Sequence, residues 1–296
     1  MDGEKKLTAR TLKYHLNTTL INTIAFSGII ILVILTSFII NESIPALTNV
    51  GAELFTSVYW YPTNSFDPEF GILAMLVGSL YITGLTALFV LPLGYIIAFF
   101  LFEYASASEV RVIKSAIDLL SGVPSVIIGA FMLVYVAPLS FKLNIYTPEN
   151  ILIASLGLTI LSLPYTASLM QEAMQSVDRS LKEGALALGS TRLTAGFKVV
   201  SRAAISGILN AVILTVNRII GETMVVLMVS GGAAIIPRSL FDPVKPLTAT
   251  IASEMGEVAT GSVHYSVLFF CGLILLVFSF LLTISARLII SKNKHV

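Results

Sequence analysis

Six long apolar segments constrain this chain more than any single motif, because each is long enough to cross a lipid bilayer. They lie at 18–40, 71–102, 119–139, 151–170, 203–231 and 264–290. A helix needs about 20 residues to cross a hydrocarbon core of about 30 Å. Only 12% of the 296 residues are charged, against about 25% in soluble proteins. Since lipid satisfies no backbone hydrogen bonds, the sequence predicts an all-α integral membrane protein with six transmembrane helices.

The basic residues between these segments indicate which side of the membrane each one faces. Six spans place both termini on the same side. Of the 18 lysines and arginines, 14 lie in 1–17, 103–118 and 171–202 and at the C-terminal end, three lie in the intervening loops, and Arg218 lies inside a span. Because cytoplasmic loops carry the excess of basic residues, we expect both termini in the cytoplasm.

These assignments divide the chain into segments. They are a cytoplasmic N-terminal segment (1–17), a first transmembrane helix (18–40), an extracytoplasmic loop (41–70), a five-helix core (71–290) and a cytoplasmic tail (291–296). The core contains a charged cytoplasmic loop at 171–202 and an extracytoplasmic loop at 232–263. We expect the first helix to stay uncleaved, because its apolar run exceeds the roughly 7 to 15 residues of a signal peptide.

Several kinds of site are excluded by what the sequence lacks. The net charge is +1, which gives no basic excess for binding nucleic acid. The single Cys271 lies in an apolar run and is expected to be a small buried hydrophobe. The three histidines, His15, His264 and His295, are far apart in the sequence. We therefore expect no metal site, no cofactor and no catalytic residues; a membrane enzyme would need a Ser/His/Asp or metal cluster.

Two charged residues, Arg218 and Glu222, interrupt the fifth apolar segment. On a continuous helix, residues four apart lie on one face and can touch. A charge at the bilayer centre costs about 2.5 to 3.5 kcal/mol on insertion scales, and a buried ion pair that only neutralises itself gains little over apolar residues. Two interpretations stay open: a polar substrate meets the pair, or the pair clamps the fifth helix against a neighbour.

The 171–202 loop is the most charged part of the chain, and it predicts two amphipathic helices joined by a turn. Gly189 is a natural C-cap for the first helix, and Ser190 or Thr191 can cap the second. The residues from Gly184 onward match G-x-x-x-x-G, but a phosphate-binding loop needs a lysine that is missing here, so we reject nucleotide binding. The hairpin either lies on anionic lipid headgroups or docks into a soluble partner.

Within this loop, Glu183-Gly184-Ala185 followed by Gly189 resembles the EAA loop of ABC importer permeases. Glu183, Ala185 and Gly189 match that motif, and Gly184 stands at its second alanine position. The chain departs from the family where a later I-x-L-P is replaced by VVSR at 199–202. The resemblance implies the type I importer permease fold. It also implies that the loop is a pair of coupling helices inserting into an ATP-hydrolysing subunit.

Further motifs between 70 and 287 are similar to those of phosphate importer permeases, and closer to the PstC-type subunit than to its PstA-type partner. They are FGIL at 70–73, VGSL at 77–80, PLG at 92–94, EYA at 103–105, GVPSV at 122–126, RIIGETM at 218–224, SLFDP at 239–243, LTATIA at 247–252 and EMGE at 254–257. The resemblance implies an ATP-driven importer of inorganic phosphate in a prokaryotic cell membrane. Its other parts would be a second permease subunit (PstA-like), a dimer of ATP-binding subunits (PstB-like) and an extracytoplasmic phosphate-binding protein (PstS-like).

The charged pair is the candidate substrate pathway. Arg218 suits phosphate, because its planar fork binds two oxygens and stays charged at any relevant pH. Glu222 would keep the site weak enough for the anion to leave. One arginine would also accept sulfate or molybdate, so an importer of another oxyanion stays open. An ion-coupled secondary transporter is less favoured, because it usually has an internal repeat and none is recognisable here.

Other features have two interpretations each. The aromatic run at 59–61 is either an interfacial belt or a knot that packs its loop on itself. The GVPS stretch at 122–125 is a helix start or a break bordering the substrate path. The 232–263 loop is a docking surface for the external protein or a plain cap. Asn210 and Asn217 are expected to hydrogen-bond between helices.

Overall fold

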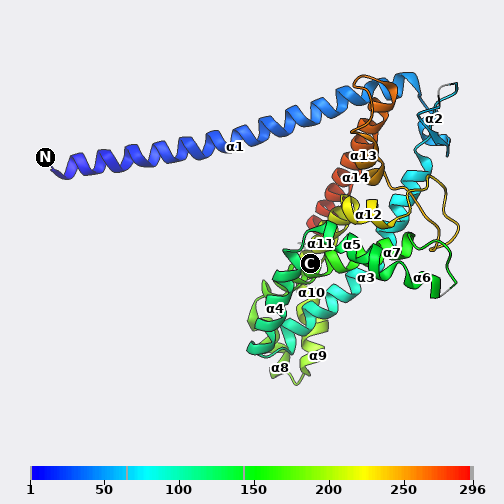
Figure 1. Cartoon of the computed structure of the whole chain (residues 1–296). Coiled ribbons are helices and arrows are strands. Elements are labelled where there is room, and N and C mark those ends of the chain that lie inside the picture. Colours follow the sequence, from blue (N-terminus) through cyan, green and yellow to red (C-terminus); the bar gives the residue numbers. More distant parts are fainter. Residues whose placement is uncertain (1, 65, 143, 294–296) are drawn as a thin grey trace.

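The structure is a computed structural model that describes residues 2–64, 66–142 and 144–293 (Figure 1). In chain order its elements are α1 (Asp2–Asn49), α2 (Glu53–Thr56), β1 (Trp60–Tyr61), β2 (Glu69–Phe70), α3 (Leu73–Glu103), α4 (Ala107–Ser121), α5 (Ser125–Phe131), the π-helical η1 (Met132–Val136), α6 (Leu139–Lys142), α7 (Ile151–Gln175), α8 (Arg179–Ala187), α9 (Arg192–Thr194), the π-helical η2 (Ala195–Val200), α10 (Ser201–Ala203), α11 (Ile205–Ile220), α12 (Met224–Val229), α13 (Leu247–Glu254) and α14 (Val263–Asn293).

The predominantly helical fold that the sequence predicts is confirmed. Among the described residues, five helices are long and apolar enough to cross a membrane, or six when the bent pair Arg192–Ala203 and Ile205–Ile220 counts as one. Of the expected tail at 291–296, the first three residues belong to α14, and 294–296 lie outside the described residues.

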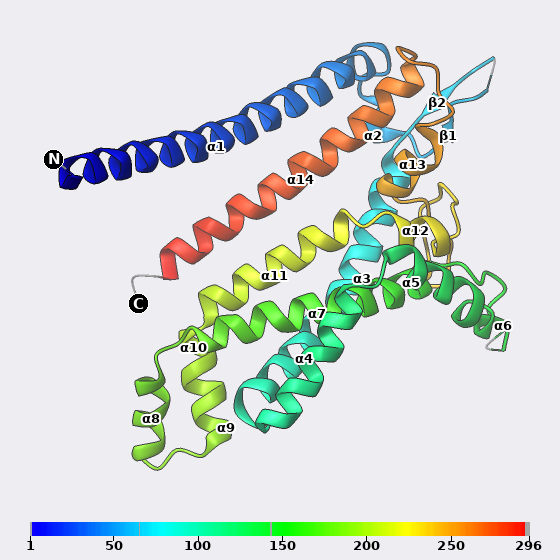
Figure 2. The same cartoon turned by 60° about the vertical axis from the view of Figure 1, so that its left-hand side comes forward.

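Helix α1 is longer than the sequence predicts. It continues past position 40, through Pro45, to Asn49, where a loop was expected. Tertiary packing holds this extension, because Ser43 and Ala46 are buried against the rest of the chain. Closer to the N-terminus, large apolar side chains such as Leu32 are exposed, and this part of α1 projects away from the body in Figures 1 and 2. Apolar surface of this extent is suited to lipid or another subunit.

Helices α3 and α7 form the centre of the bundle and pack along each other. A Cβ atom at Gly94 would lie 2.7 Å from Thr166 Cγ2, so a glycine on α3 allows the two helices to approach closely. Thr166 also shares a hydrogen bond with Thr215 of α11, with 3.1 Å between the hydroxyl oxygens. The core thus joins α3, α7 and α11.

The third apolar segment starts later than predicted. The span expected at 119–139 is wrong at its start, because α4 ends at Ser121 as a separate helix and the candidate span runs over Ser125–Lys142. Pro124 causes the division: its φ of −58° and ψ of 137° make it the N-cap of α5, and proline cannot continue the preceding helix. The stretch at 122–125 is therefore a helix start.

The two ends of the bundle carry different structures (Figure 2). The hairpin of α8 and α9 lies at one end, and the β1–β2 hairpin with α13 lies at the other. The two strands are antiparallel, with Trp60 opposite Phe70. Both of these side chains are buried, whereas Tyr59 and Tyr61 are exposed. The aromatic knot is thus the correct interpretation for Trp60, and the two tyrosines remain on the surface.

Candidate functional site

The fifth apolar segment, predicted as one span over 203–231, is broken beside its charged residues. Helix α11 ends at Ile220, and α12 starts only at Met224. The predicted contact between Arg218 and Glu222 is therefore wrong, because the helix that would align the two side chains ends between them. No ion pair joins them in the part of the chain that the structure describes.

Two hydrogen bonds at Glu222 satisfy backbone groups that this break leaves without helical partners. Its carbonyl oxygen accepts a hydrogen bond from Thr248 Oγ1 at 3.1 Å, which ties the break to α13. Its carboxylate accepts one from Met224 N at 3.2 Å, at the start of α12. Acidic groups at a helix N-terminus are favourable. Glu222 thus stabilises the break and stays only half-buried.

Arg218 lies on the surface of the chain near the end of α11. Its guanidinium carbon is 5.1 Å from the ring centroid of Tyr165 in α7, a cation–π contact. Within the described residues, no carboxylate pairs with it. The Arg–Glu clamp considered from the sequence is thus not formed, and Arg218 is an exposed cation without an ion-pair partner among the described residues.

Asn217 fixes the end of α11 against α14. Its Nδ2 donates a hydrogen bond to Thr283 Oγ1 at 3.1 Å, and Thr283 donates to Ser279 O at 2.8 Å. The interhelical bond predicted for Asn217 is confirmed, whereas the side chain of Asn210 is exposed. Since α11 is held on its other side by α7, the position of the break is fixed from both sides.

The hairpin at 176–203 has the turn that the sequence predicts. Gly189 follows α8 with a φ of +86°, a conformation that favours glycine. Gly189 N donates to Leu186 O at 3.0 Å, and Ser190 N donates to Ala185 O at 3.1 Å. These two bonds close a Schellman turn, which confirms Gly189 as the C-cap glycine.

Side chains cap both helices of the hairpin. Asp178 starts α8, and its carboxylate accepts a hydrogen bond from Ser180 N at 2.9 Å. Thr191 starts the second helix by accepting one from Thr194 N at 3.2 Å. Of the two caps considered from the sequence, Thr191 is the one formed. Local chemistry therefore specifies the turn and both helix starts of this hairpin.

The hairpin exposes several large apolar side chains. They are Leu181, Leu186, Leu188, Leu193 and Phe197; Leu186 lines the cavity between α8 and the membrane helices, and Phe197 lies beside Tyr95. Glu183 and Gly184 are exposed and Ala185 is half-buried. A Cβ atom at Gly184 would meet nothing within 4 Å, and α8 has no buried residue. This surface therefore has room for a partner and apolar area to offer it.

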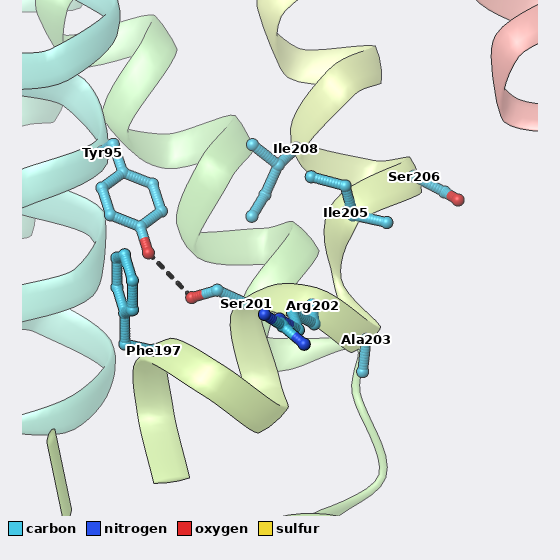
Figure 3. Close-up of a pocket in the computed structure, with 8 residues that line it drawn as sticks. All are labelled: Tyr95, Phe197, Ser201, Arg202, Ala203, Ile205, Ser206 and Ile208. Atoms are coloured by element: carbon cyan, nitrogen blue, oxygen red, sulfur yellow. Dashed lines mark hydrogen bonds between the residues drawn. The ribbon is translucent and has the colours of Figure 1, made fainter. Parts of the chain in front are cut away.

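Between the hairpin and α11 the chain bends by 72°. The bend follows the stretch at 199–202, where the sequence departs from the EAA pattern. A groove of about 830 Å³ lies beside it (Figure 3), lined by Tyr95, Phe197, Ser201, Arg202, Ala203, Ile205, Ser206 and Ile208. Tyr95 of α3 and Ser201 of α10 share a hydrogen bond across the groove, with 2.8 Å between their oxygens. This bond anchors the bend to the core.

At the opposite end of the bundle, the carboxylate of Glu254 is contacted by three nitrogen-bearing side chains. Trp60 Nε1 lies 3.1 and 3.2 Å from its two carboxylate oxygens, His264 Nε2 lies 2.7 Å from Oε2, and Lys245 forms an ion pair with Oε1. The cluster joins β1, the segment before α13 and the start of α14. The sequence shows Glu254 only as the first residue of the EMGE motif and does not predict this cluster, since Trp60 lies 194 residues away in the chain.

Acid is expected to loosen this cluster. Burial opposes ionisation of Glu254, but hydrogen bonds from Lys245 and His264, the Lys245 charge and the Trp60 indole outweigh it and hold its pKa below the usual 4.5. A lowered folded-state pKa stabilises the fold above pH 4.5, and this contribution is lost as the pH falls through the folded-state value. Trp60 is the single tryptophan, so its fluorescence in detergent should change below pH 4.5.

Glu254→Gln is the matching variant. It removes a charged acceptor that contributes about 1.5 to 3 kcal/mol, so the Tm at pH 7 should fall by several degrees. The acid-induced change in fluorescence should disappear. Glu257→Gln, at an exposed position nearby, is the control and should behave as wild type. An unchanged Tm for Glu254→Gln would contradict a stabilising role of the cluster.

Comparison with known proteins shows the family to which the chain belongs. Residues 90–295 match the family described as "Binding-protein-dependent transport system inner membrane component". The chain belongs to this family. It is thus a permease subunit, the membrane component of an ABC transporter, and a separate subunit hydrolyses ATP.

Individual relatives are similar to this permease subunit over most of its length. The "Probable ABC transporter permease protein YqgH" of Bacillus subtilis is 37% identical over 262 residues, covering 88% of this chain and 82% of the relative. The "Phosphate transport system permease protein PstC" of Mesorhizobium japonicum is 32% identical over 289 residues, covering 90% of this chain and 87% of the relative. The protein of the same name from Haemophilus influenzae is 28% identical, covering 92% of each chain.

Solved structures confirm the type I ABC permease fold of this subunit. A chain of a bacterial ABC transporter involved in the import of alginate superposes with a TM-score of 0.66, at 15% identity, covering 94% of this subunit and 96% of that chain. A chain of the MetNI methionine ABC transporter superposes with a TM-score of 0.58, at 20% identity, covering 73% of this subunit and 93% of that chain.

Proposed function

We propose that this permease subunit forms half of the translocation pathway of an ATP-driven importer of inorganic phosphate. The observation that carries the anion assignment is Arg218: an exposed guanidinium in an apolar segment, with no carboxylate partner among the described residues. Similarity to phosphate transport permeases over 90% of the chain supports phosphate among the possible oxyanions.

The path is proposed to pass the break between α11 and α12. A guanidinium that faced lipid would cost about 2.5 to 3.5 kcal/mol on insertion scales, so Arg218 faces a polar space between subunits. There its fork binds two oxygens of the passing anion. Glu222, half-buried and capping α12, adds a negative charge close by. That charge weakens binding and lets the anion leave.

The hairpin at 176–203 is proposed to be the coupling loop. Glu183, Gly184 and Ala185 lie on α8, and Gly189 turns the chain back toward the membrane helices. Inserted into a groove of the ATPase, the exposed leucines would be covered, and Glu183 would meet a polar rim. Movement of the ATPase then reaches α11 through the bend that Ser201 anchors to α3.

The orientation of the chain in the membrane follows from the proposal that the hairpin is the coupling loop. The hairpin faces the cytoplasm together with both termini, and the chain crosses the membrane six times, as its basic residues predict. The opposite end, with the Glu254 cluster and the 232–263 loop, faces outward and receives the external phosphate-binding protein. A second, PstA-like permease subunit completes the pathway, and a dimer of PstB-like ATP-binding subunits drives it.

Purification of the tagged subunit from its native membrane tests the assembly. We expect an ATPase with a phosphate-binding loop, a second permease and this chain to copurify at two, one and one copies. Recovery of the chain alone, as an active transporter that needs no ATP, would support a secondary transporter and reject the proposal.

A further inference from the structure

Helix α8 is attached to the membrane helices by few direct contacts. It has no buried residue, and a cavity of about 700 Å³, lined by residues that include Phe102, Val177 and Leu186, lies between it and the ends of α3 and α7. The chain connects α8 to α7 on one side and to α9 on the other. A direct connection from α8 to α3 therefore has to cross this space through side chains.

Lys182 makes that connection. Its Nζ lies 2.8 Å from Oε2 of Glu103, the last residue of α3, and 5.0 Å from the ring centroid of Phe102. The Glu103 side chain is 0% exposed, and that of Lys182 is 25% exposed. In the described part of the chain, Lys182 is the one cation that pairs with this carboxylate.

Gly196 of η2 covers the same carboxylate from the other side. A Cβ atom at Gly196 would lie 3.0 Å from the Phe99 ring and 3.1 Å from Glu103 Oε2, so the glycine lets the backbone pack close to both side chains. Both carboxylate oxygens of Glu103 are buried and accept no hydrogen bond among the described residues, so the Lys182 ammonium is what balances their charge. Because removing one partner leaves a buried charge uncompensated, opening this ion pair is strongly unfavourable.

We propose that the Glu103–Lys182 ion pair is the latch that makes α3 follow the movements of α8. Lys182 is a positioning residue: it touches no substrate and acts by holding the coupling helix on α3. A movement of α8 would then reach the core directly, since α3 packs along α7 at Gly94 and Thr166. This inference rests on the proposed coupling role of the hairpin.

The double variant Glu103→Gln/Lys182→Met tests the latch in the assembled transporter. Neutralising both partners leaves no unpaired buried charge, so the chain folds without the ion pair. We expect the rate of ATP hydrolysis to stay within about twofold of wild type and the rate of phosphate uptake to fall about tenfold. A tenfold loss is a typical size for the coupling between two distant sites of one protein. The single variant Lys182→Arg keeps a cation beside Glu103 and should import phosphate at the wild-type rate. The control Lys114→Met, which removes an exposed lysine of α4 outside the hairpin, should leave uptake unchanged.

A second readout does not depend on the transported solute. Proteinase K should cut the 176–191 segment of the purified full chain about tenfold faster in the double variant, because α8 opens more often. Lys114→Met should be cut at the wild-type rate. Wild-type uptake and wild-type cleavage in the double variant would overturn the latch. If the wild-type complex imports no phosphate, the proposed function is rejected. Faster cleavage of the double variant would still show, in that case, that the ion pair holds α8 on α3.

Discussion

Gly184→Trp is expected to abolish ATP-driven uptake while leaving the permease subunit itself folded. A Cβ atom at position 184 meets nothing within 4 Å, and glycine inside a helix costs about 1 kcal/mol relative to alanine, so the chain tolerates the change. The indole instead occupies the space into which the ATPase is proposed to fit. A clash at an interface centre of on the order of 3 kcal/mol lowers ATPase affinity about 150-fold.

Retention of the ATPase on the tagged subunit measures this effect, with uptake measured on the same membranes. Gly256→Trp is the matched control, since a Cβ atom there also meets nothing within 4 Å and position 256 lies at the opposite end of the bundle. It should retain the ATPase fully. Full retention by Gly184→Trp, with normal uptake, would show that the hairpin is not where the ATPase binds.

Arg218→Gln is expected to lower phosphate uptake about 100-fold, because a bidentate charged contact contributes about 3 kcal/mol. Arg218→Lys keeps the charge without the fork and should lose about tenfold. The assembly should survive both changes, since Arg218 is exposed and its contact with the Tyr165 ring contributes about 1 kcal/mol or less. Initial rates of radiolabelled phosphate uptake give the measurement.

The neighbours of Arg218 separate a transport role from a structural one. Glu222→Gln can still accept the hydrogen bond from Met224 N but loses its charge, so it should tighten anion binding and slow release. Tyr165→Leu removes the ring under Arg218 and should have a small effect. Normal uptake by both Arg218→Lys and Glu222→Gln in a stable complex would rule out the pathway role. A loss in Tyr165→Leu as large as in Arg218→Gln would favour a contact that only holds helices together.

The sequence was most informative where structure depends on nearby residues. In the hairpin at 176–203, the C-cap glycine and the capping threonine could be predicted because each acts within a few residues of its own position. The same reasoning could have separated α4, since Ser106 and Glu109 form a capping box whose S-x-x-E spacing is visible in the sequence.

The break beside Arg218 could not be predicted, because its partners come from distant parts of the chain. The run from 203 to 231 is apolar enough to continue as a helix, and Gly221 alone is a weak signal. What stabilises the break is the Thr248 hydroxyl on the Glu222 carbonyl. For the same reason, Glu254 and the Glu103–Lys182 pair could be found only after the fold had brought their partners together.

Phosphate uptake into proteoliposomes containing the complete assembly tests the central claim most directly. With the ATPase, both permease subunits and the external phosphate-binding protein present, uptake should require ATP and this subunit, and a large excess of sulfate should not compete. The Arg218→Gln subunit should assemble normally and fail to transport. Uptake without ATP, or equal competition by sulfate in an assembly that contains the external protein, would contradict a phosphate importer.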